Sequence, residues 1–249
     1  MPIYDDGILK LILKNENSIL IKIIRNPIIK FFQNVIEVVL MVLLNLPIPV
    51  YSTIINIIIT NLPGFPHISG CYLRALYYKP KMRKMGKNVI IDQGVNIFYP
   101  KNMELSDYVY IDKYVTIASK ETKIGRRVHI APYTFITGGG NCIIEDFAGI
   151  ANNCSIITST VTSKEGIRLS GPMIPESQTD IIRGEVIIKK DAFIGTKATI
   201  FTNVTVSEGS VIGAGTIITK TTEPWGVYIS EGGKAKLLRK RKIISLEDV

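Results

Sequence analysis

Few residues in this chain could serve as catalytic bases or metal ligands. It has two histidines, His67 and His129, and three cysteines, Cys71, Cys142 and Cys154. Because the chain has only two histidines, it cannot form a zinc site with three imidazole ligands, and no metal is expected. The cysteines are far apart and in no CxxC spacing, so a disulfide scaffold is not expected and a reducing compartment is favoured. If the catalytic base is a histidine, it must therefore be one of these two residues.

Basic side chains gather near the C-terminus. The chain has 30 Lys plus Arg and 21 Asp plus Glu, a net charge of +9. Six of the nine residues from 234 to 242 are basic. This cluster is either a solvated tail or a contact for phosphate on a nucleotide-like cofactor or an anionic membrane. Nucleic acid is not expected as a partner, because the cluster is short and has no interleaved aromatics.

A six-residue period supplies the scaffold that must position these residues. Branched aliphatics recur at this spacing, one run being Ile188, Ile194, Ile200, Val206, Ile212 and Ile218. Small or β-branched residues follow four positions after each, and glycine often comes directly after the aliphatic. We interpret this as a coil of short strands, in which the aliphatic fills the interior and the small residue turns the corner. Three such units make a three-sided turn of about 18 residues, and turns must stack to bury their apolar faces.

The segment before residue 81 has a different composition. From Ile28 to Leu62 it is dominated by Ile, Val and Leu, with breaks at Pro47 and Pro49. Polar residues recur there at helical spacing and predict three amphipathic helices with broad apolar faces. The polar stripes are Lys10, Lys14, Asn17, Lys22 and Arg25; Lys30, Gln33, Asn34, Glu37 and Asn45; and Ser52, Asn56 and Thr60.

Helices of this kind have several uses. They can lie in a membrane interface, enter it as a shallow hairpin, or cover another domain, and a true span is a further alternative. Interfacial attachment is the favoured interpretation. A secretory signal is not expected, because Asp5 and Asp6 sit near the start and no small-residue cleavage site follows.

The repeat and its motifs resemble the hexapeptide-repeat acyltransferases over about residues 90 to 242. The segments 87–90 and 213–220 are similar to that family's opening and closing coils. The stretches 128–133, 138–140 and 146–150 resemble its polysaccharide and lipopolysaccharide O-acetyltransferase branch. The resemblance implies a mainly β fold, a left-handed parallel β-helix that acts as a homotrimer.

Three parts of the chain are expected on this basis. Residues 1–80 form an amphipathic, membrane-associated helical region. Residues 81–233 form the β-helix acyltransferase domain, with a long loop at 157–187. Residues 234–249 form a basic C-terminal tail.

Acyl transfer from a thioester needs a base for the acceptor's proton and donors for the oxyanion. Many members of the family carry the histidine base in a projecting loop, but the corresponding loop from Thr158 to Glu185 has no histidine. His129 is therefore the predicted base, and a surface or subunit-interface histidine is the alternative. Asp146 could orient its imidazole or instead cap the adjacent corner.

The register also predicts the neighbours of His129. It precedes the inward Ile130, so its side chain should face outward, with Tyr110 below, Gly149 above and Phe193 one turn further. The oxyanion donors would be backbone N–H groups of the glycine run, residues 138–140. The alternative is that this run is a simple bulge that passes the chain over a corner. The predicted acceptor contacts are Tyr110, Gly138, Gly139, Gly140 and Asn141, with Thr162 and Ser163 in the long loop.

The resemblance implies acetyl-CoA as the acyl donor, lying in a groove between subunits. Its pantetheine arm would meet backbone at Gly195, Thr196, Gly213 and Ala214. Its phosphates would meet Lys220, Lys234, Lys236 and Arg239. The single tryptophan, Trp225, is expected to pack the last coil rather than to stack on adenine.

Together these expectations describe an acetyl-CoA-dependent O-acetyltransferase. Its acceptor would be a hydroxyl of a sugar, or lipid-linked sugar, in a cell-surface glycan precursor at the cytoplasmic face of the membrane. The alternatives are N-acetylation of an amino sugar and a non-catalytic scaffold in a membrane glycan-synthesis complex.

Overall fold

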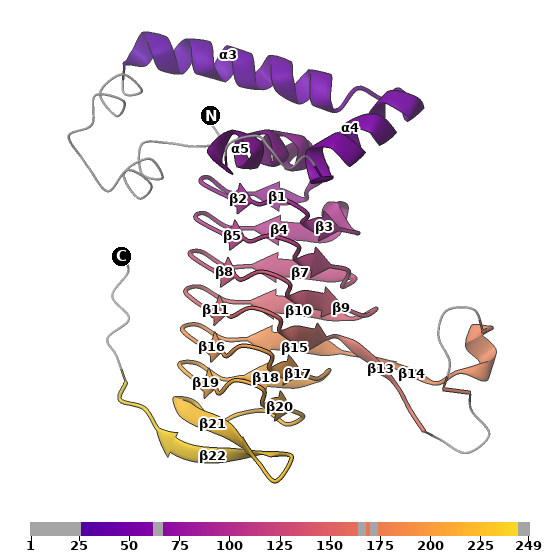
Figure 1. The fold of residues 1–249 in the computed structure, drawn as a ribbon, viewed down its shortest axis with the longest axis vertical. Helices are drawn as coiled ribbons and strands as arrows, with labels where there is room; N and C mark the ends of the chain where they lie inside the picture. Colours follow the sequence, from indigo (N-terminus) through magenta and orange to yellow (C-terminus); the bar gives the residue numbers. More distant parts are fainter. Residues whose placement is uncertain (1–25, 62–66, 164–167, 170–173, 244–249) are drawn as a thin grey trace.

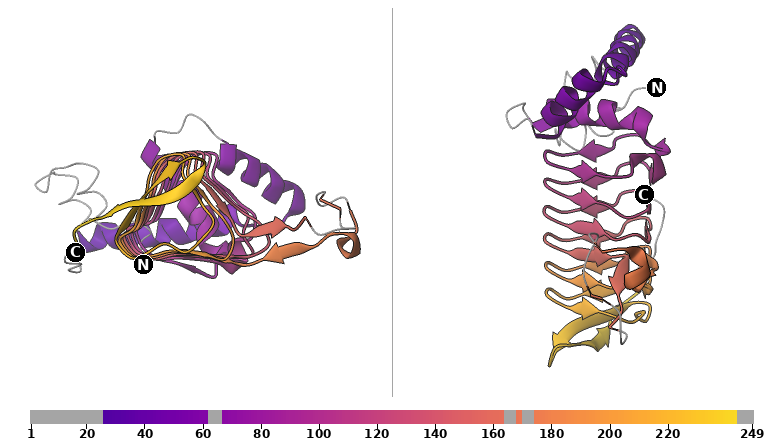
Figure 2. Two further views of the ribbon diagram at one scale, coloured as in Figure 1. Left: turned by 90° about the horizontal axis from the view of Figure 1, so that it is seen from below. Right: turned by 90° about the vertical axis from the view of Figure 1, so that its right-hand side faces the viewer.

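Stacked coils of short parallel strands form a three-sided prism with helices at its N-terminal end (Figures 1 and 2). The computed structural model describes residues 26–61, 67–163, 168–169 and 174–243. The expected helix over Lys10 to Arg25 lies outside the described residues. The mainly β parallel solenoid predicted from the six-residue period is confirmed.

Each side of the prism is one sheet. The first sheet contains β1 (Lys84–Met85), β4 (Met103–Leu105), β7 (Glu121–Ile124), β10 (Asn141–Ile144), β15 (Glu185–Ile188) and β18 (Val204–Val206). The second contains β2 (Ile90–Ile91), β5 (Tyr110–Ile111), β8 (His129–Ile130), β11 (Gly149–Ile150), β16 (Phe193–Ile194), β19 (Val211–Ile212), β21 (Gly226–Glu231) and β22 (Lys234–Lys240). The third contains β3 (Asn96–Ile97), β6 (Thr116–Ile117), β9 (Phe135–Thr137), β12 (Ser155–Ile157), β17 (Thr199–Ile200) and β20 (Ile217–Ile218).

Branched aliphatics stack in the interior because the register places equivalent residues of successive coils side by side. Ile111 pairs with Ile130, which pairs with Ile150, and Ile150 pairs with Ile194. All four side chains are buried. Burial of an aliphatic side chain of this size contributes about 1.5 to 3 kcal/mol to folding. The residue before each of them faces outward, and this alternation presents His129 to the surface.

Tight corners join the first sheet to the second and turn through residues with positive φ. Tyr108, Arg127 and Phe147 hold equivalent corner positions with φ of 60°, 57° and 60°. This left-handed conformation costs a non-glycine residue about 1 to 2 kcal/mol. Neighbouring corners offset the cost through backbone bonds, such as that from Phe147 N–H to Arg126 O at 2.9 Å. The stack therefore fixes where each outward side chain begins.

Three described helices precede the prism: α3 (Pro27–Leu44), α4 (Pro49–Asn61) and α5 (His67–Tyr78), followed by the 3-10 turn η1 (Lys79–Lys81). α5 covers the first coil (Figure 1). Arg74 of α5 forms a buried ion pair with Asp92 at 3.5 Å. Its Nε also donates to Ile91 O at 2.7 Å. The helical region is thus tied to the coil that begins the second sheet.

α3 has its polar stripe turned inward. Glu37 is only 2% exposed and accepts hydrogen bonds from Tyr72 Oη at 2.7 Å and Gln33 Nε2 at 3.1 Å. The apolar side chains of α3 point away from the protein and are exposed, among them Ile28, Phe31, Phe32, Val35, Val38, Val39 and Val42. An amphipathic helix on a water-facing surface has the opposite arrangement. The spacing predicted the stripe, but not that it would face the protein.

Two antiparallel additions depart from the coil. β13 (Ser159–Val161) pairs with β14 (Ile181–Arg183) as an arm that projects from the edge between the third and first sheets (Figures 1 and 2). This arm also carries the 3-10 turn η3 (Glu176–Gln178), and a second such turn, η2 (Pro100–Asn102), lies in an earlier coil. β22 folds back on β21, so residues 234–240 form a paired strand and not a free tail, because their backbone bonds to the last coil.

Candidate active site

His129 lies on the outer face of the second sheet in the predicted setting. β8 runs between β5 and β11, so His129 pairs with Tyr110 on one side and Gly149 on the other. Gly149 in turn pairs with Phe193. The imidazole stacks on the Tyr110 ring with centroids 4.9 Å apart and planes 18° from parallel. Its side chain is 49% exposed, so it is accessible to a ligand or to a second subunit.

Asp112, and not Asp146, is the carboxylate beside this histidine. Asp112 Oδ2 lies 3.4 Å from His129 Nε2. Asp146 instead accepts the Arg126 N–H at 2.6 Å and so caps the corner of the preceding coil, between the first and second sheets. The expected orienting role of Asp146 is therefore corrected, because its carboxylate is held by a backbone donor away from the imidazole. The missed signal is that Asp112 directly follows Ile111, the partner of Ile130.

Tyr110 connects the histidine to the helical region. Its hydroxyl donates to Asp92 Oδ2 at 3.2 Å, and Asp92 is the ion-pair partner of Arg74 on α5. Burial, reinforced by the charges of Asp112 and Asp92, raises the pKa of Tyr110 well above its usual value. The phenol therefore stays protonated and keeps donating. A chain of contacts thus runs from α5 to the ring that supports His129.

The space outside Gly149 is partly filled. A Cβ at this position would lie 3.1 Å from Cδ2 of Phe193, so the Phe193 ring reaches over the glycine. Phe193 is itself exposed. The absence of a side chain at Gly149 therefore lets the exposed Phe193 ring pack beside the histidine.

The glycine run holds the base of the projecting arm. Gly139 N–H donates to Ser159 Oγ at 3.1 Å, and Gly140 N–H donates to Thr158 Oγ1 at 3.2 Å. Both are already hydrogen-bonded within the chain, which corrects the interpretation of these two groups as oxyanion donors. A Cβ on Gly140 would lie 1.9 Å from Gly184 O, so the approach of the arm requires glycine there. Asn141 follows as the first residue of β10.

The predicted acceptor residues of the loop lie on the arm. Thr162 donates through Oγ1 to Asp180 Oδ2 at 2.6 Å, and its N–H donates to Asp180 O at 2.9 Å. Antiparallel pairing thus brings a carboxylate to Thr162 that sequence order does not suggest, while the neighbouring Ser163 is exposed. The arm leaves a different edge of the prism from the face that holds His129 (Figure 2). One chain alone does not bring them together.

The predicted pantetheine contacts occupy consecutive corners between the second and third sheets. Gly195 N–H donates to Ile212 O at 2.8 Å, and Gly213 N–H donates to Tyr228 O at 2.7 Å. Both N–H groups are thus used within the stack, whereas Ala214 is exposed. Thr196 Oγ1 donates to Asn152 Oδ1 at 2.8 Å.

The predicted phosphate contacts lie at the C-terminal end of the prism. Their side chains are exposed, and the structure places them after β20 and along β22: Lys220, Lys234, Lys236 and Arg239. Lys236 forms an ion pair with Glu231 across the β21–β22 hairpin. Trp225 is buried under the guanidinium of Arg241, at 5.2 Å from the ring, and so packs the last coil.

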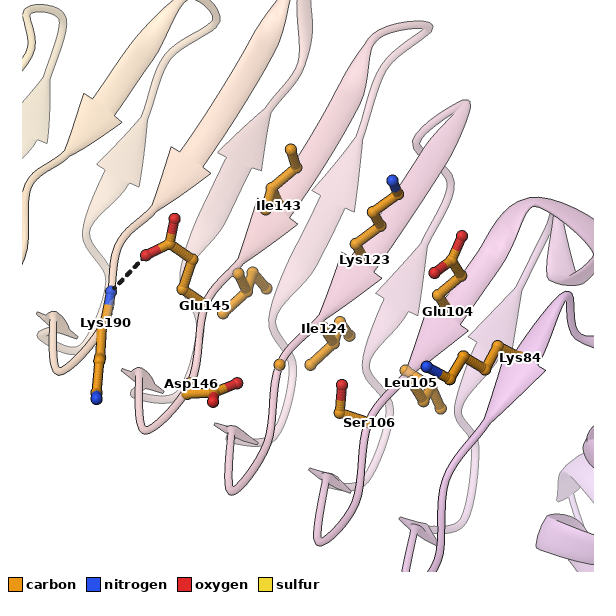
Figure 3. Close-up of a pocket in the computed structure, with 12 residues that line it drawn as sticks. Lys84, Glu104, Leu105, Ser106, Lys123, Ile124, Ile143, Glu145, Asp146 and Lys190 are labelled. Atoms are coloured by element: carbon orange, nitrogen blue, oxygen red, sulfur yellow. Dashed lines mark hydrogen bonds between the residues drawn. The ribbon is translucent and has the colours of Figure 1, made fainter. Parts of the chain in front are cut away.

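A groove of about 420 Å³ on the first sheet is separate from the histidine (Figure 3). Its charged lining balances three lysines, Lys84, Lys123 and Lys190, against three carboxylates, Glu104, Glu145 and Asp146. Lys190 donates its backbone N–H to Glu145 Oε2 at 3.1 Å. His129 does not line it, so this groove gives no support to the histidine as base.

The parallel coil and the exposed pair of His129 and Asp112 define a β-helix protein with a candidate site on its outer face. Comparison with known proteins shows to which family of β-helix proteins it belongs. No protein-family model matches the chain. The dTDP-4-amino-4,6-dideoxy-D-glucose acyltransferase of Escherichia coli is 30% identical over 169 residues, which cover 67% of this chain and 88% of that protein. The chain therefore belongs to the hexapeptide-repeat acyltransferases with left-handed β-helices and is an acyltransferase.

Solved structures agree with this assignment. AntD, an N-acyltransferase from Bacillus cereus solved in complex with dTDP and 3-hydroxybutyryl-CoA, is 29% identical with a TM-score of 0.62. The match covers 66% of this chain and 86% of AntD. A maltose O-acetyltransferase from Clostridium difficile 630 has a TM-score of 0.53 at 18% identity, over 78% of this chain and 86% of that one. At that identity the likeness shows the fold alone.

Proposed function

We propose that this protein transfers an acetyl group from acetyl-CoA to a hydroxyl of a sugar in a glycan precursor. The observation that carries the proposal is an accessible histidine, stacked on Tyr110 and beside Asp112, on the outer face of an acyltransferase β-helix. The coenzyme A and acyl-CoA bound by AntD support the choice of donor.

The chemistry is a direct acyl transfer. Asp112 beside Nε2 favours the tautomer with a proton on that nitrogen, which leaves Nδ1 as the proton acceptor. Nδ1 takes the hydroxyl proton as the sugar oxygen attacks the thioester carbonyl. The carbon–sulfur bond then breaks, and the imidazolium returns the proton to the coenzyme A thiolate. Asp112 stabilises the charged ring between these two steps.

Variants at three positions test these roles with labelled acetyl-CoA. His129→Ala is expected to lower kcat/KM by about 10²- to 10⁴-fold, the usual contribution of a general base. Asp112→Asn is expected to lower it less, and Asp146→Asn, the matched control, to leave it within about twofold. Full activity in His129→Ala would overturn the base assignment. A larger loss in Asp146→Asn than in Asp112→Asn would overturn the orienting role of Asp112.

N-acylation of an amino sugar is a second candidate, supported by the amino-sugar substrate in the name of the Escherichia coli relative. We would offer maltose and dTDP-4-amino-4,6-dideoxyglucose as acceptors and treat the labelled products with hydroxylamine. Hydroxylamine cleaves an ester and leaves an amide intact. If label remains after this treatment and is found only on the amino sugar, the activity is N-acylation and not O-acetylation.

A homotrimer would complete the site. The arm and His129 lie on different parts of one prism, and the 49% exposure of His129 leaves its ring in water unless another copy covers it. In a trimer, the arm of one copy would reach the second sheet of the next. Light scattering with deletion of the arm tests this: a trimer that loses activity on deletion supports it, and an active monomer contradicts it.

The helical region would hold the enzyme at the cytoplasmic face of a membrane. Among the described residues, one helix, Pro27–Leu44, is long and apolar enough to cross a bilayer. The inward position of Glu37 and the exposed apolar side chains of α3 support contact with lipid. Val38→Glu and Val42→Glu together should abolish flotation with phosphatidylcholine vesicles, whereas Lys30→Glu should not. Equal flotation of the double variant and the wild type would contradict this contact.

A further inference from the structure

A cavity lies where the helical region meets the first coil. Its volume is about 370 Å³. It is lined by Asn56 and Ile57 of α4, Tyr77 and Tyr78 of α5, Lys81 of η1, and Gly94, Asn96, Ile97 and Pro100 of the first coil and its corner. None of these residues takes part in the site around His129.

Lys81 is a partly desolvated cation in this lining. Its Nζ lies 3.2 Å from the centroid of the Tyr77 ring. The lining contains no carboxylate, and no described acidic residue pairs with this ammonium group. Burial lowers the pKa of Lys81 to about 8. In the groove of Figure 3, by contrast, carboxylates match the lysines in number.

α4 contributes an apolar side chain to the lining that continues onto the exposed face of the helix. Ile57 lines the cavity and is 56% exposed. Val50, Ile54 and Ile58 of the same helix are also exposed. A hydrocarbon chain leaving the cavity along this side would therefore stay in contact with apolar surface. The lining also includes the amide side chains of Asn56 and Asn96, and the Tyr77 hydroxyl donates to Asn56 Oδ1 at 2.8 Å.

We propose that this cavity binds the phosphate head group of a membrane lipid, with Lys81 as its charge partner and α4 beside its hydrocarbon chain. A phosphate supplies an anion for Lys81, which none of the described carboxylates provides, and accepts hydrogen bonds from amide side chains. The assignment rests on the membrane contact proposed for the helical region and is independent of the acyl transfer.

Flotation separates the site from general membrane contact. Vesicles of phosphatidylcholine alone, and with added phosphatidic acid, would be mixed with the wild type, Lys81→Met and Lys101→Met. Lys101 is an exposed cation on η2 outside the cavity, so it is the matched control. Phosphatidic acid should increase flotation of the wild type and of Lys101→Met but not of Lys81→Met. Equal gains in all three would overturn the site while leaving membrane contact in place.

Calorimetry in a neutral detergent separates a lipid phosphate from free phosphate. Dodecyl phosphate should bind the wild type and bind Lys81→Met about tenfold more weakly or worse, as expected for loss of a charged hydrogen bond. Inorganic phosphate and dodecanol should each bind weakly. Equal binding of inorganic phosphate and dodecyl phosphate would overturn the lipid as the ligand, and equal binding by the two proteins would overturn the site.

The pH dependence provides a further test. Lys81 must be protonated to pair with phosphate, so binding should weaken by up to tenfold per pH unit above pH 8. The other titratable groups lining the cavity are the phenols of Tyr77 and Tyr78. Burial raises the pKa of Tyr77, so it stays neutral over this range. Affinity that is constant from pH 7 to about pH 9.5 would contradict the role of Lys81.

Discussion

The ion pair between Arg74 and Asp92 fixes the helical region to the prism, and its removal should be costly. The two side chains are 5% and 3% exposed. Arg74→Met leaves the Asp92 carboxylate buried, with the Gln93 N–H at 2.6 Å and the Tyr110 hydroxyl at 3.2 Å as hydrogen-bond donors. Loss of one partner of a buried ion pair costs about 3 to 5 kcal/mol. For a chain of this size this corresponds to a fall in Tm of about 6 to 20 °C.

Replacing both partners should recover most of that loss. Arg74→Met with Asp92→Leu removes the uncompensated charge, so the double variant should be more stable than Arg74→Met alone. Arg83→Met is the matched control, because its contacts with Glu104 at 3.4 Å and Glu121 at 3.5 Å are solvent-exposed and contribute at most about 1 kcal/mol. Thermal unfolding of all variants would be followed by circular dichroism in the same detergent. Equal losses in Arg74→Met and Arg83→Met, or strictly additive effects in the double variant, would refute the reasoning.

Three further outcomes are expected. Ile150→Ala should lower the free energy of unfolding in urea by about 2 to 5 kcal/mol, because this side chain is 1% exposed, whereas Ile217→Ala, at 48% exposure, should cost far less; equal losses would contradict the interior stack. Gly140→Ala should loosen the arm and speed its proteolysis, because its Cβ would meet backbone oxygen, whereas Gly139→Ala meets only the flexible Arg183 side chain and should be tolerated; equal cleavage rates would count against this packing. Burial raises the pKa of Cys142 to about 12, so its alkylation by iodoacetamide should stay slow from pH 7 to 9 until the protein unfolds. Alkylation would be measured by mass spectrometry, and fast labelling of the folded protein would refute the burial of this thiol.

The coil could be predicted because its signal is local and repeated. The six-residue spacing fixes which side chains face inward, and parallel register then places Tyr110 and Gly149 beside His129. The partner of the imidazole could not be found in the same way. Asp112 stands at a corner, where the repeat does not determine the direction of a side chain. Asp146 stands at a different edge, the corner between the first and second sheets, where it accepts a backbone N–H.

The roles of the glycine run and of α3 depend on contacts distant in sequence. Gly140 must be glycine because the Gly184 carbonyl lies against it, and the long loop between them hides that approach in the sequence. In α3, helical spacing predicted a polar stripe, but Tyr72 of α5 determines that the stripe faces the protein. Periodicity alone does not show which medium each face of a helix contacts.

The two ends of the second sheet limit how far the prism can grow. An uncovered terminal coil would present a row of unpaired backbone donors and acceptors, on which another parallel strand could add, from this chain or from another molecule. At the N-terminal end α5 lies across that row at β2. At the C-terminal end β22 runs antiparallel to β21 and carries four exposed cations, Lys234, Lys236, Arg239 and Lys240. Glu231 and Glu223 pair with two of them, and the remaining positive charge repels an identical edge. The helix and the basic hairpin thus act as stops against end-to-end polymerisation of the solenoid.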